Sequence, residues 1–368
     1  MRNLLSRLIL YETRLIRDPA RQVCYHVGLT RNVRTEILRK FKPVRPWILV
    51  CLLSAAGGGA QHASAAPQWF RGNLHAHSNN SDGDSPPIVL INWYRFHGYQ
   101  FLAISDHNLF TDPSTYAAYR SKDFLLIGAE EITHDSGVHV NAIGIQRAIP
   151  PQRGVSATEL LQNSIDAIRA QGGVPLINHP NFGWAFNARA MLPLKRVALL
   201  DIMNTHPQVN SYGDGVISST EQMWDELLSS GMHLFGAAVD DAHNFRDEFL
   251  LNRANPGRAW VMVRSTVLSR DAIMAGLASG EFYSSTGVVL TDISQANNSL
   301  TVEIDSDGRG NPHYRTVFIG NHGHVLAVSQ KNPAIYKLRG DEVYVRARVE
   351  DSGGLRAWTQ PIFISPRP

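Results

Sequence analysis

Cysteine is scarce in this sequence. The 368 residues include two cysteines, Cys24 and Cys51, and both precede residue 66. Any metal site in the rest of the chain must therefore use nitrogen and oxygen ligands, and no disulfide can form there.

Long hydrophobic runs are also missing. The apolar stretch WILVCLLSAAGGGA occupies residues 47–60 and has 14 residues. A helix rises about 1.5 Å per residue, so this stretch is too short to cross a hydrocarbon core of about 30 Å comfortably. We expect no stable membrane span in the mature chain.

The flanks of this stretch indicate export instead. Lys40, Lys42 and Arg45 precede it, and small residues follow at Ala63 and Ala65. The order of charged, apolar and small residues is that of a secretory signal. We predict an N-terminal extension over residues 1–66 with an apolar core at 47–60, cleavage near residue 65, and a periplasmic or secreted protein. A short internal hydrophobic helix is the alternative.

Excess positive charge is absent from the predicted mature chain. Residues 1–46 hold 11 basic and 3 acidic side chains, which leaves 24 basic and 29 acidic side chains in the remainder. A protein that depends on nucleic-acid binding usually carries a basic patch or stripe. We therefore expect no obligate nucleic-acid partner.

Serine-based acyl transfer also lacks its motif. The segment YSSTG at residues 283–287 does not form a Gly-x-Ser-x-Gly nucleophile elbow. An acyl-enzyme intermediate is therefore not expected.

Strand and helix patterns alternate through the first part of the chain. Apolar runs predict strands, and SATELLQNSIDAIRAQGG at residues 156–173 begins with a capping box of Ser156 and Glu159. We expect an α/β fold, a distorted seven-stranded (β/α) barrel over residues 67–256. The predicted strands lie near residues 70–76, 101–105, 124–131, 138–145, 174–179, 197–203 and 234–240.

The pattern changes near Pro256. Short alternating strands separated by Gly, Asn and Asp follow, as in TVEIDSDG and VYVRARVEDSGG. They predict a small C-terminal β-sandwich over residues 257–368.

Imidazole and carboxylate side chains gather at the ends of the predicted strands. A single such histidine is usually a hydrogen-bonded or surface residue, and paired acids usually belong to a solvated loop. The coincidence of many donors at one end of a barrel favours a metal site instead, and nitrogen and oxygen donors suit Zn, Mn or Fe. Two or three ions are expected from the candidate ligands His75, His77, Asp82, His107, Glu131, His139, His179, Asp241 and His243.

Several motifs resemble those of one family in their order along the chain. NLHAHSNNSDG, AISDHN, GAEEIT, VHVNAIG, NHP and DDAH are similar to the successive motifs of the PHP superfamily of metal-dependent phosphoesterases. The resemblance is strongest to its carbaryl-hydrolase-like (CehA/McbA) branch, and GEFYSSTGVVLTDI also resembles the C-terminal module of that branch. The likeness extends from about residue 69 to the end.

This resemblance implies how the donors are shared. His75, His77, Glu131 and Asp241 would hold the first ion, Glu131 would bridge to a second ion bound by His139 and His179, and Asp82, His107 and His243 would hold a third. A water bound to metal at Glu131, His75 and Asp241 would be the attacking group.

Two departures from the family pattern affect this assignment. Asn73 stands where many relatives have Asp, and we interpret it as a support behind the ligands. Glu130 and Glu131 both fit the bridging position, and we choose Glu131 because Ile132 and Thr133 follow it. Asp106 and Asp240 are expected to orient ligating histidines, with His206 beside them.

The implied activity is hydrolysis of a small-molecule phosphoester. Carbamate or carboxylic ester hydrolysis and an exonuclease-like phosphodiesterase are alternatives, and an exported metal-containing binding module is the non-enzymatic one. We expect His206, Trp184, Phe186 and Tyr283–Thr286 to be candidates for the pocket, although aromatic loop residues more often cover the core. Arg253 and Arg258 could contact a phosphate but lie in no phosphate-binding motif.

Overall fold

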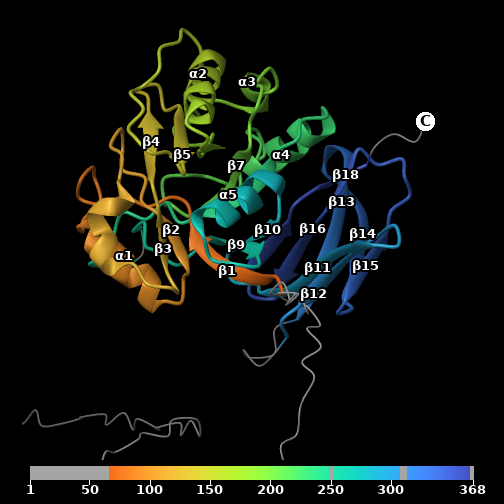
Figure 1. Cartoon of the computed structure of the whole chain (residues 1–368). Helices are drawn as coiled ribbons and strands as arrows, with labels where there is room; N and C mark the ends of the chain where they lie inside the picture. Colours follow the sequence, from red (N-terminus) through yellow and green to blue (C-terminus); the bar gives the residue numbers. More distant parts are fainter. Residues whose placement is uncertain (1–65, 248–249, 251, 307–312, 365–368) are drawn as a thin grey trace, which may run out of the picture. The chain divides into compact units, whose positions relative to one another are not determined.

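The computed structural model describes residues 66–247, 250, 252–306 and 313–364. The predicted signal peptide, its cleavage site and both cysteines lie outside these residues. Among the described helices, none is long and apolar enough to cross a membrane. The fold is a mixed α/β arrangement of three sheets and few helices (Figure 1).

The largest sheet combines strands from both ends of the described chain. Its strand order is β14-β13-β16-β17-β10-β9-β1-β2-β3, with β18 paired to β16. β1, β2 and β3 are parallel to one another, and β9 is antiparallel to β1. The bounds are β1 Gln68–Asn73, β2 Phe101–Ala103, β3 Leu125–Ile127, β9 Trp260–Ser265, β10 Phe282–Ser285, β13 Tyr314–Gly320, β14 His324–Ser329, β16 Tyr344–Asp351, β17 Arg356–Thr359 and β18 Ile362–Phe363.

A second sheet has five strands in sequence order. β4 and β5 are antiparallel, as are β5 and β6, whereas β6, β7 and β8 are parallel. The bounds are β4 Ala129–Thr133, β5 His139–Ile143, β6 Val174–Ile177, β7 Leu199–Asn204 and β8 Phe235–Val239.

Each predicted strand range overlaps an observed strand, but a closed seven-stranded (β/α) barrel is not confirmed. The predicted strand over residues 124–131 divides at Gly128 into β3 and β4, which belong to different sheets. A Cβ atom at Gly128 would lie 2.7 Å from the Ile145 carbonyl oxygen, so close backbone approach breaks the strand there. The five residues between β4 and β5 are too few for a parallel crossover, which explains their antiparallel pairing.

The helices begin where the sequence offers caps. Ser156 accepts a hydrogen bond from the Glu159 backbone, as predicted, but the Glu159 carboxylate accepts from Val155 and not from Ser156. Ser219 and Gln222 form a complete capping box. The bounds are α1 Pro87–Phe96, α2 Ala157–Ala170, α3 Ala188–Met191, α4 Thr220–Ser229 and α5 Arg270–Ser279, with 3-10 turns η1 Pro113–Tyr119 and η2 Asn321–Gly323.

One apolar cluster joins the first two sheets. Leu74 and Phe101 come from the large sheet side, Leu176 and Val239 from the five-stranded sheet, and Leu277 from α5. All of them are buried. The two sheets thus share an interior although their strands do not form a continuous ring of hydrogen bonds.

The C-terminal strands form two facing sheets. β11 Leu290–Ala296, β12 Ser299–Ile304 and β15 Ala334–Lys337 make a three-stranded sheet, whose side chains share a core with β13 and β16 (Figure 1). This arrangement resembles the predicted sandwich. However, β9 and β10 extend the sheet that contains β1, so sheet pairing runs across the predicted boundary at residues 256/257. The boundary itself stays a prediction.

A buried ion pair connects α4 to the C-terminal strand β16. Arg346 has no exposed surface, and its guanidinium donates to both carboxylate oxygens of Asp225 at 2.8 and 2.7 Å. The Tyr344 hydroxyl donates to the same carboxylate at 2.7 Å. Glu221 also pairs with Arg346 at 2.8 Å, so the buried guanidinium is shared between two carboxylates of α4 and loses one of them when Asp225 is removed.

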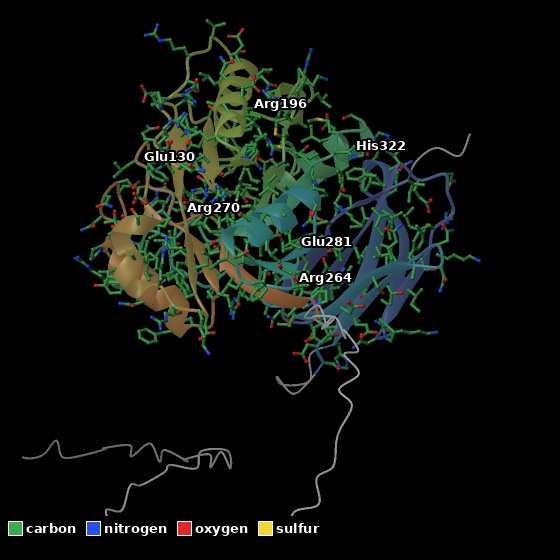
Figure 2. All side chains as sticks on the ribbon, in the orientation of Figure 1. Glu130, Arg196, Arg264, Arg270, Glu281 and His322 are labelled. Carbon is green, nitrogen blue, oxygen red and sulfur yellow. The ribbon has the colours of Figure 1, made fainter. Side chains whose placement is uncertain are left out.

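We predict that Asp225→Ala lowers the free energy of unfolding by about 1.5–3 kcal/mol, measured by chemical denaturation, because Arg346 and Tyr344 lose hydrogen bonds to a buried carboxylate while Glu221 still pairs with Arg346. Asp166→Ala is the matched control, because Asp166 pairs with the exposed Arg196 (Figure 2) at 2.6 Å and should cost less than about 1 kcal/mol. Equal losses in the two variants would contradict this account.

Candidate metal centre

His75 and His77 follow the end of β1. Ala76 between them forms a parallel bridge to Ala242, so the two histidine side chains point to the same side of the backbone. Their Nε2 atoms lie 3.1 Å apart, and both residues have no exposed surface. Two imidazole nitrogens that face each other this closely are typical of a shared cation or proton.

Glu131, on β4, lies at the centre of the histidines. It has no exposed surface. Its carboxylate oxygens lie close to ring nitrogens of His75 (3.4 Å), His77 (3.4 Å), His107 (2.9 Å), His139 (3.2 Å) and His179 (3.3 Å).

Asp241 lies beside the same pair of histidines. Its Oδ1 is 3.2 Å from His75 Nε2 and 3.3 Å from His77 Nε2. Asp241 and His179 have positive φ angles of 51° and 22°, a conformation that costs a non-glycine residue about 1–3 kcal/mol. Both residues follow the ends of parallel strands, β8 and β6, and the strained backbone directs their side chains into the cluster.

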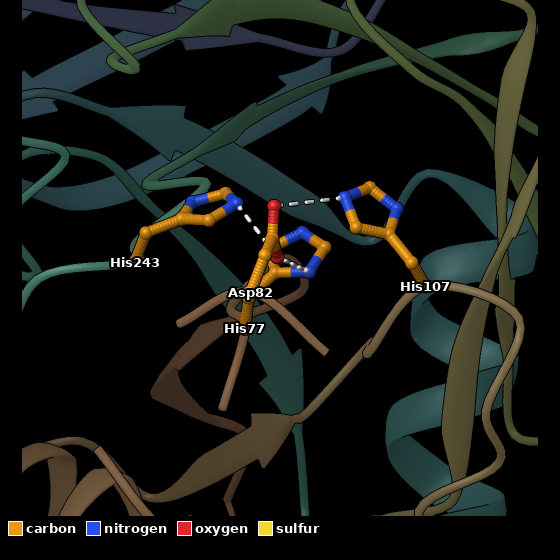
Figure 3. A group of neighbouring side chains, drawn as sticks. All are labelled: His77, Asp82, His107 and His243. Atoms are coloured by element: carbon orange, nitrogen blue, oxygen red, sulfur yellow. Dashed lines mark ion pairs between the residues drawn. The ribbon is translucent and has the colours of Figure 1, made fainter. Parts of the chain in front are cut away.

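Asp82 forms the outer part of the cluster. Its carboxylate is 3.6 Å from His77 Nδ1, 3.5 Å from His107 Nε2 and 3.4 Å from His243 Nε2. Figure 3 shows His107 and His243 on opposite sides of this carboxylate. The Asp82 side chain is 55% exposed, whereas that of Glu131 is 0% exposed. The cluster therefore runs from the protein interior to solvent.

The structure brings together all nine predicted ligands, and their donor atoms suit divalent cations. The buried Glu131 Oε2 lies 2.9 Å from His107 Nδ1 and 3.4 Å from His77 Nε2, so imidazole nitrogens surround an oxygen that a cation would engage. The role of these nine residues as metal ligands stays a prediction. The groups whose donor atoms lie within 4.8 Å of one another are His77-Asp82-His107-His243, His75-His179-Asp241, His75-His77-Glu131 and His107-Glu131-His139.

Carboxylates strongly change the pKa values of these histidines. Burial alone would lower the pKa of His75, but Asp241 and Glu131 raise it to about 9. Burial likewise opposes the rise at His107, whose pKa reaches about 10 because Asp82 and Glu131 bond to it. Burial and the charge of His243 lower the pKa of His77 to about 4. Without metal, protons therefore sit on some of the ligands at neutral pH.

Asp106 and Asp240 support backbone and hydroxyl groups, which differs from the expected role. Asp106 accepts hydrogen bonds from the Ser78 backbone (2.7 Å) and from the Ser81 hydroxyl (2.9 Å). Asp240 accepts from Tyr94 and from the backbone of residues 257–259. These bonds hold the loop of Asp82 and the segment that leads into β9, and neither carboxylate has a hydrogen bond to an imidazole among the described residues.

The supporting amides were missed by sequence reasoning. Asn178 donates to Glu131 Oε1 at 2.6 Å, and Asn204 donates to Asp241 Oδ2 at 3.0 Å and to the buried Asp201 at 2.9 Å. Asn73 donates to the His75 carbonyl oxygen and to Tyr94, which agrees with its interpretation as a support. The available signal was a polar residue inside or ending an apolar strand, as in LLDIMN.

A small cavity of about 90 Å³ opens onto the cluster. None of its described lining residues is Lys or Arg. It is lined by Asp82, His107, Glu131, His139, His179, Phe182, His206, Gln208, Asp241 and His243.

Most of the other expected pocket residues lie elsewhere. Phe186 and Tyr283 belong to apolar clusters, and Trp184 is half-exposed. Arg253 pairs with Asp247, and Arg258 donates to Asn255. Of the candidates named from the sequence, His206 lines the cavity, and the neighbouring Phe182 was missed.

Comparisons with known proteins give distant likenesses. No protein-family model and no curated protein matches the chain. Similar solved structures include a two-domain protein from Bacteroides vulgatus with a predicted PHP-like metal-dependent phosphoesterase, at 14% identity and a TM-score of 0.47, covering 80% of this chain and 95% of that one. An amidohydrolase from Chromobacterium violaceum with bound sulfate and no metal has 14% identity, a TM-score of 0.35, and coverage of 50% and 93%. A putative metal-dependent phosphoesterase from Bifidobacterium adolescentis has 14% identity and a TM-score of 0.36, and the match covers 48% of this chain and 89% of that one.

The adjacent acids Glu130 and Glu131 provide a matched test of the centre. Glu130 accepts a hydrogen bond from the Ile149 backbone, and burial raises its pKa to about 7. We predict that Glu131→Gln loses at least one bound ion because the neutral amide is a poor ligand, whereas Glu130→Gln keeps the wild-type metal content. Elemental analysis of both proteins, with circular dichroism to verify folding, would measure this. Loss of metal from Glu130→Gln, with wild-type metal content in Glu131→Gln, would assign the bridging role to Glu130.

Metal uptake should release protons. At pH 7 His75 and His107 lie below pKa values of about 9 and about 10, so both are protonated without metal and must lose a proton to coordinate. The pKa of His243 is also raised, by Asp82 and Asp241. We predict release of at least about two protons per protein on loading at pH 7, and tighter binding as the pH rises towards 9. Calorimetry of chelator-treated protein in buffers of different ionisation enthalpy counts these protons. A binding enthalpy that does not depend on the buffer would refute this prediction.

Proposed function

We propose that this chain is a metal-dependent hydrolase of the PHP superfamily that cleaves small-molecule phosphoesters. The observation that carries the proposal is the convergence of imidazoles from distant segments on one buried carboxylate, Glu131. The proposed export of the chain, based on residues 40–65, would place this activity outside the cytoplasm.

The donor set fits two or three divalent ions such as Zn, Mn or Fe. The family resemblance assigns His75, His77, Glu131 and Asp241 to one ion, Glu131, His139 and His179 to a second, and Asp82, His107 and His243 to a third. The groups of close donor atoms agree for Asp82, His107 and His243, but they place His179 with His75 and Asp241, and His139 with Glu131 and His107. When bound, such ions lower the pKa of water towards about 7 and stabilise negative charge on a substrate oxygen. The chain itself fixes the ligands: Asn178 holds Glu131, and Asn204 holds Asp241.

Exposure of the outer ligands favours a catalytic centre over a structural one. The His107 side chain is 26% exposed and that of Asp82 is 55% exposed, and both line the cavity. A structural site is closed by protein ligands, whereas a catalytic site keeps a position for water or substrate. This gradient of exposure argues against the non-enzymatic alternative, a binding module in which the metal ions are only structural.

Hydrolysis of a carbamate or carboxylic ester is the second candidate. The described cavity lining has no Lys or Arg to pair with a phosphate dianion, and Phe182 provides an apolar wall beside His179 at a ring separation of 5.4 Å. These features are compatible with an uncharged ester and with the carbaryl-hydrolase-like (CehA/McbA) branch.

We predict that wild-type protein releases p-nitrophenol from at least one of a phosphomonoester, a phosphodiester or a carboxylic ester. Chelation should abolish this release, and Mn²⁺ or Zn²⁺ should restore it. His75→Ala should lower kcat/KM by at least about 100-fold, since it removes a donor from the centre. The best substrate identifies the bond type.

His324→Ala is the matched control, because His324 is an exposed histidine on β14 outside the cluster. It should keep wild-type rates. Equal signals from wild type and His75→Ala, or activity that survives chelation, would refute a metal-dependent hydrolase.

A further inference from the structure

His206 follows β7 on a segment that is tied to the candidate ligands. Its backbone N–H donates to Asn204 Oδ1 at 2.8 Å, and the Asn204 amide donates to Asp241 Oδ2 at 3.0 Å. One asparagine side chain therefore holds both a candidate ligand and the start of the His206 loop. The position of His206 is coupled to the centre even though it is not grouped with the ligating donors in the described chain.

Local contacts restrain the loop after His206. Pro207 restricts its own φ and disfavours helical backbone at the residue before it. The Val209 N–H donates to the His206 carbonyl oxygen at 3.0 Å, and Val209 also forms an antiparallel bridge with Phe182. The two segments that this bridge joins contribute Phe182 and His206 to the cavity wall.

A backbone hydrogen bond sets the tautomer of the His206 ring. The Gln208 N–H donates to His206 Nδ1 at 3.2 Å. A nitrogen that accepts a hydrogen bond carries no proton, so the neutral ring has its proton on Nε2. No acceptor for this Nε2–H is recorded among the described side chains and backbone.

The ring lies next to the outer ligands. Its centroid is 5.1 Å from that of His243, and the planes are inclined by 68°. Because the described cavity wall contains no Lys or Arg, a substrate oxygen that gains negative charge has few protein donors to meet. A preorganised neutral N–H donor stabilises such charge without losing its proton.

We propose that His206 is a substrate-binding residue that donates its Nε2–H to a non-bridging oxygen of the ester. This inference rests on the proposed function and names a residue that acts on the substrate and not on a metal ion. No bond is made or broken at the imidazole, since the ring remains neutral throughout.

The test compares His206→Ala with His206→Gln in full-length protein loaded with Mn²⁺. The glutamine Nε can occupy nearly the place of the histidine Nε2 and keeps an N–H donor there. Calorimetry with inorganic phosphate should show binding about 10- to 100-fold weaker in His206→Ala, and within about 3-fold of wild type in His206→Gln. The kcat/KM for the best p-nitrophenyl ester should follow the same order.

Two further measurements separate this role from structural and ligand roles. Metal content should be equal in all three proteins, and a loss in His206→Ala would make His206 a ligand and overturn the proposal. Long-range ¹H–¹⁵N spectra of protein loaded with diamagnetic Zn²⁺ should show a neutral ring protonated at Nε2, whose signal shifts on addition of phosphate. A ring protonated at Nδ1 would also overturn it.

Failure of this inference is distinguishable from failure of the proposed function. If wild type hydrolyses esters and His206→Ala has the same phosphate affinity and kcat/KM, the donor role is wrong and the hydrolase remains. If no ester is cleaved but phosphate binding depends on His206 as expected, the donor role is supported and the hydrolase is wrong. His324→Ala again serves as the control.

Discussion

The Glu131 carboxylate is withdrawn from water and lies within 3.4 Å of ring nitrogens from five histidines. Removing a carboxylate from solvent costs several kcal/mol unless nearby positive charge compensates. Protons on the imidazoles compensate only in part, because His75 Nε2 and His77 Nε2 are 3.1 Å apart and cannot both be charged cheaply. Burial and the charge of His243 lower the pKa of His77, whereas Asp241 and Glu131 raise that of His75, so the two neighbouring rings differ in protonation. Divalent cations would complete the compensation, since each brings two charges to a point that several neutral imidazoles can share.

The same cluster lies where the two principal sheets approach each other. His107 on the β2 side bridges to Glu131 on β4, and Ala76 after β1 bridges to Ala242 after β8. Ligands come from both sheets, so bound cations would link strands that the hydrogen-bond ladders leave separate. Metal binding and folding stability are therefore expected to be coupled, as for any ligand that binds the folded chain alone. The strained backbone at His179 and Asp241 is also easiest to understand if cations offset its cost.

Sequence reasoning predicted the positions of the donors and of their strands better than it predicted how those strands pair. His75, Glu131 and Asp241 could be predicted to meet because the ends of β-strands gather at one side of an α/β core. Sheet pairing could not be predicted, because apolar periodicity indicates that a segment forms a strand but not which strand pairs with it. Close packing at Gly128 divides one apolar run between two sheets, and this depends on Ile145, which is distant in sequence. The bonds of Asp106 and Asp240 depend in the same way on tertiary contacts.

The C-terminal sheet supports the site at a distance. β16 alternates apolar and charged residues, and such a strand would ordinarily expose its polar face to water. Here Arg346 is buried against Asp225 of α4, and Arg348 pairs with Glu221 at 3.0 Å. The first residue of the same helix, Thr220, donates its hydroxyl proton to the Ile202 carbonyl oxygen of β7 at 2.6 Å. Charges on β16 thus fix α4, and α4 fixes the far end of the loop that begins at Asn204 and carries His206. A loop held at both ends keeps its imidazole in place before substrate arrives, which is the condition under which a hydrogen-bond donor stabilises developing charge without a reorganisation cost.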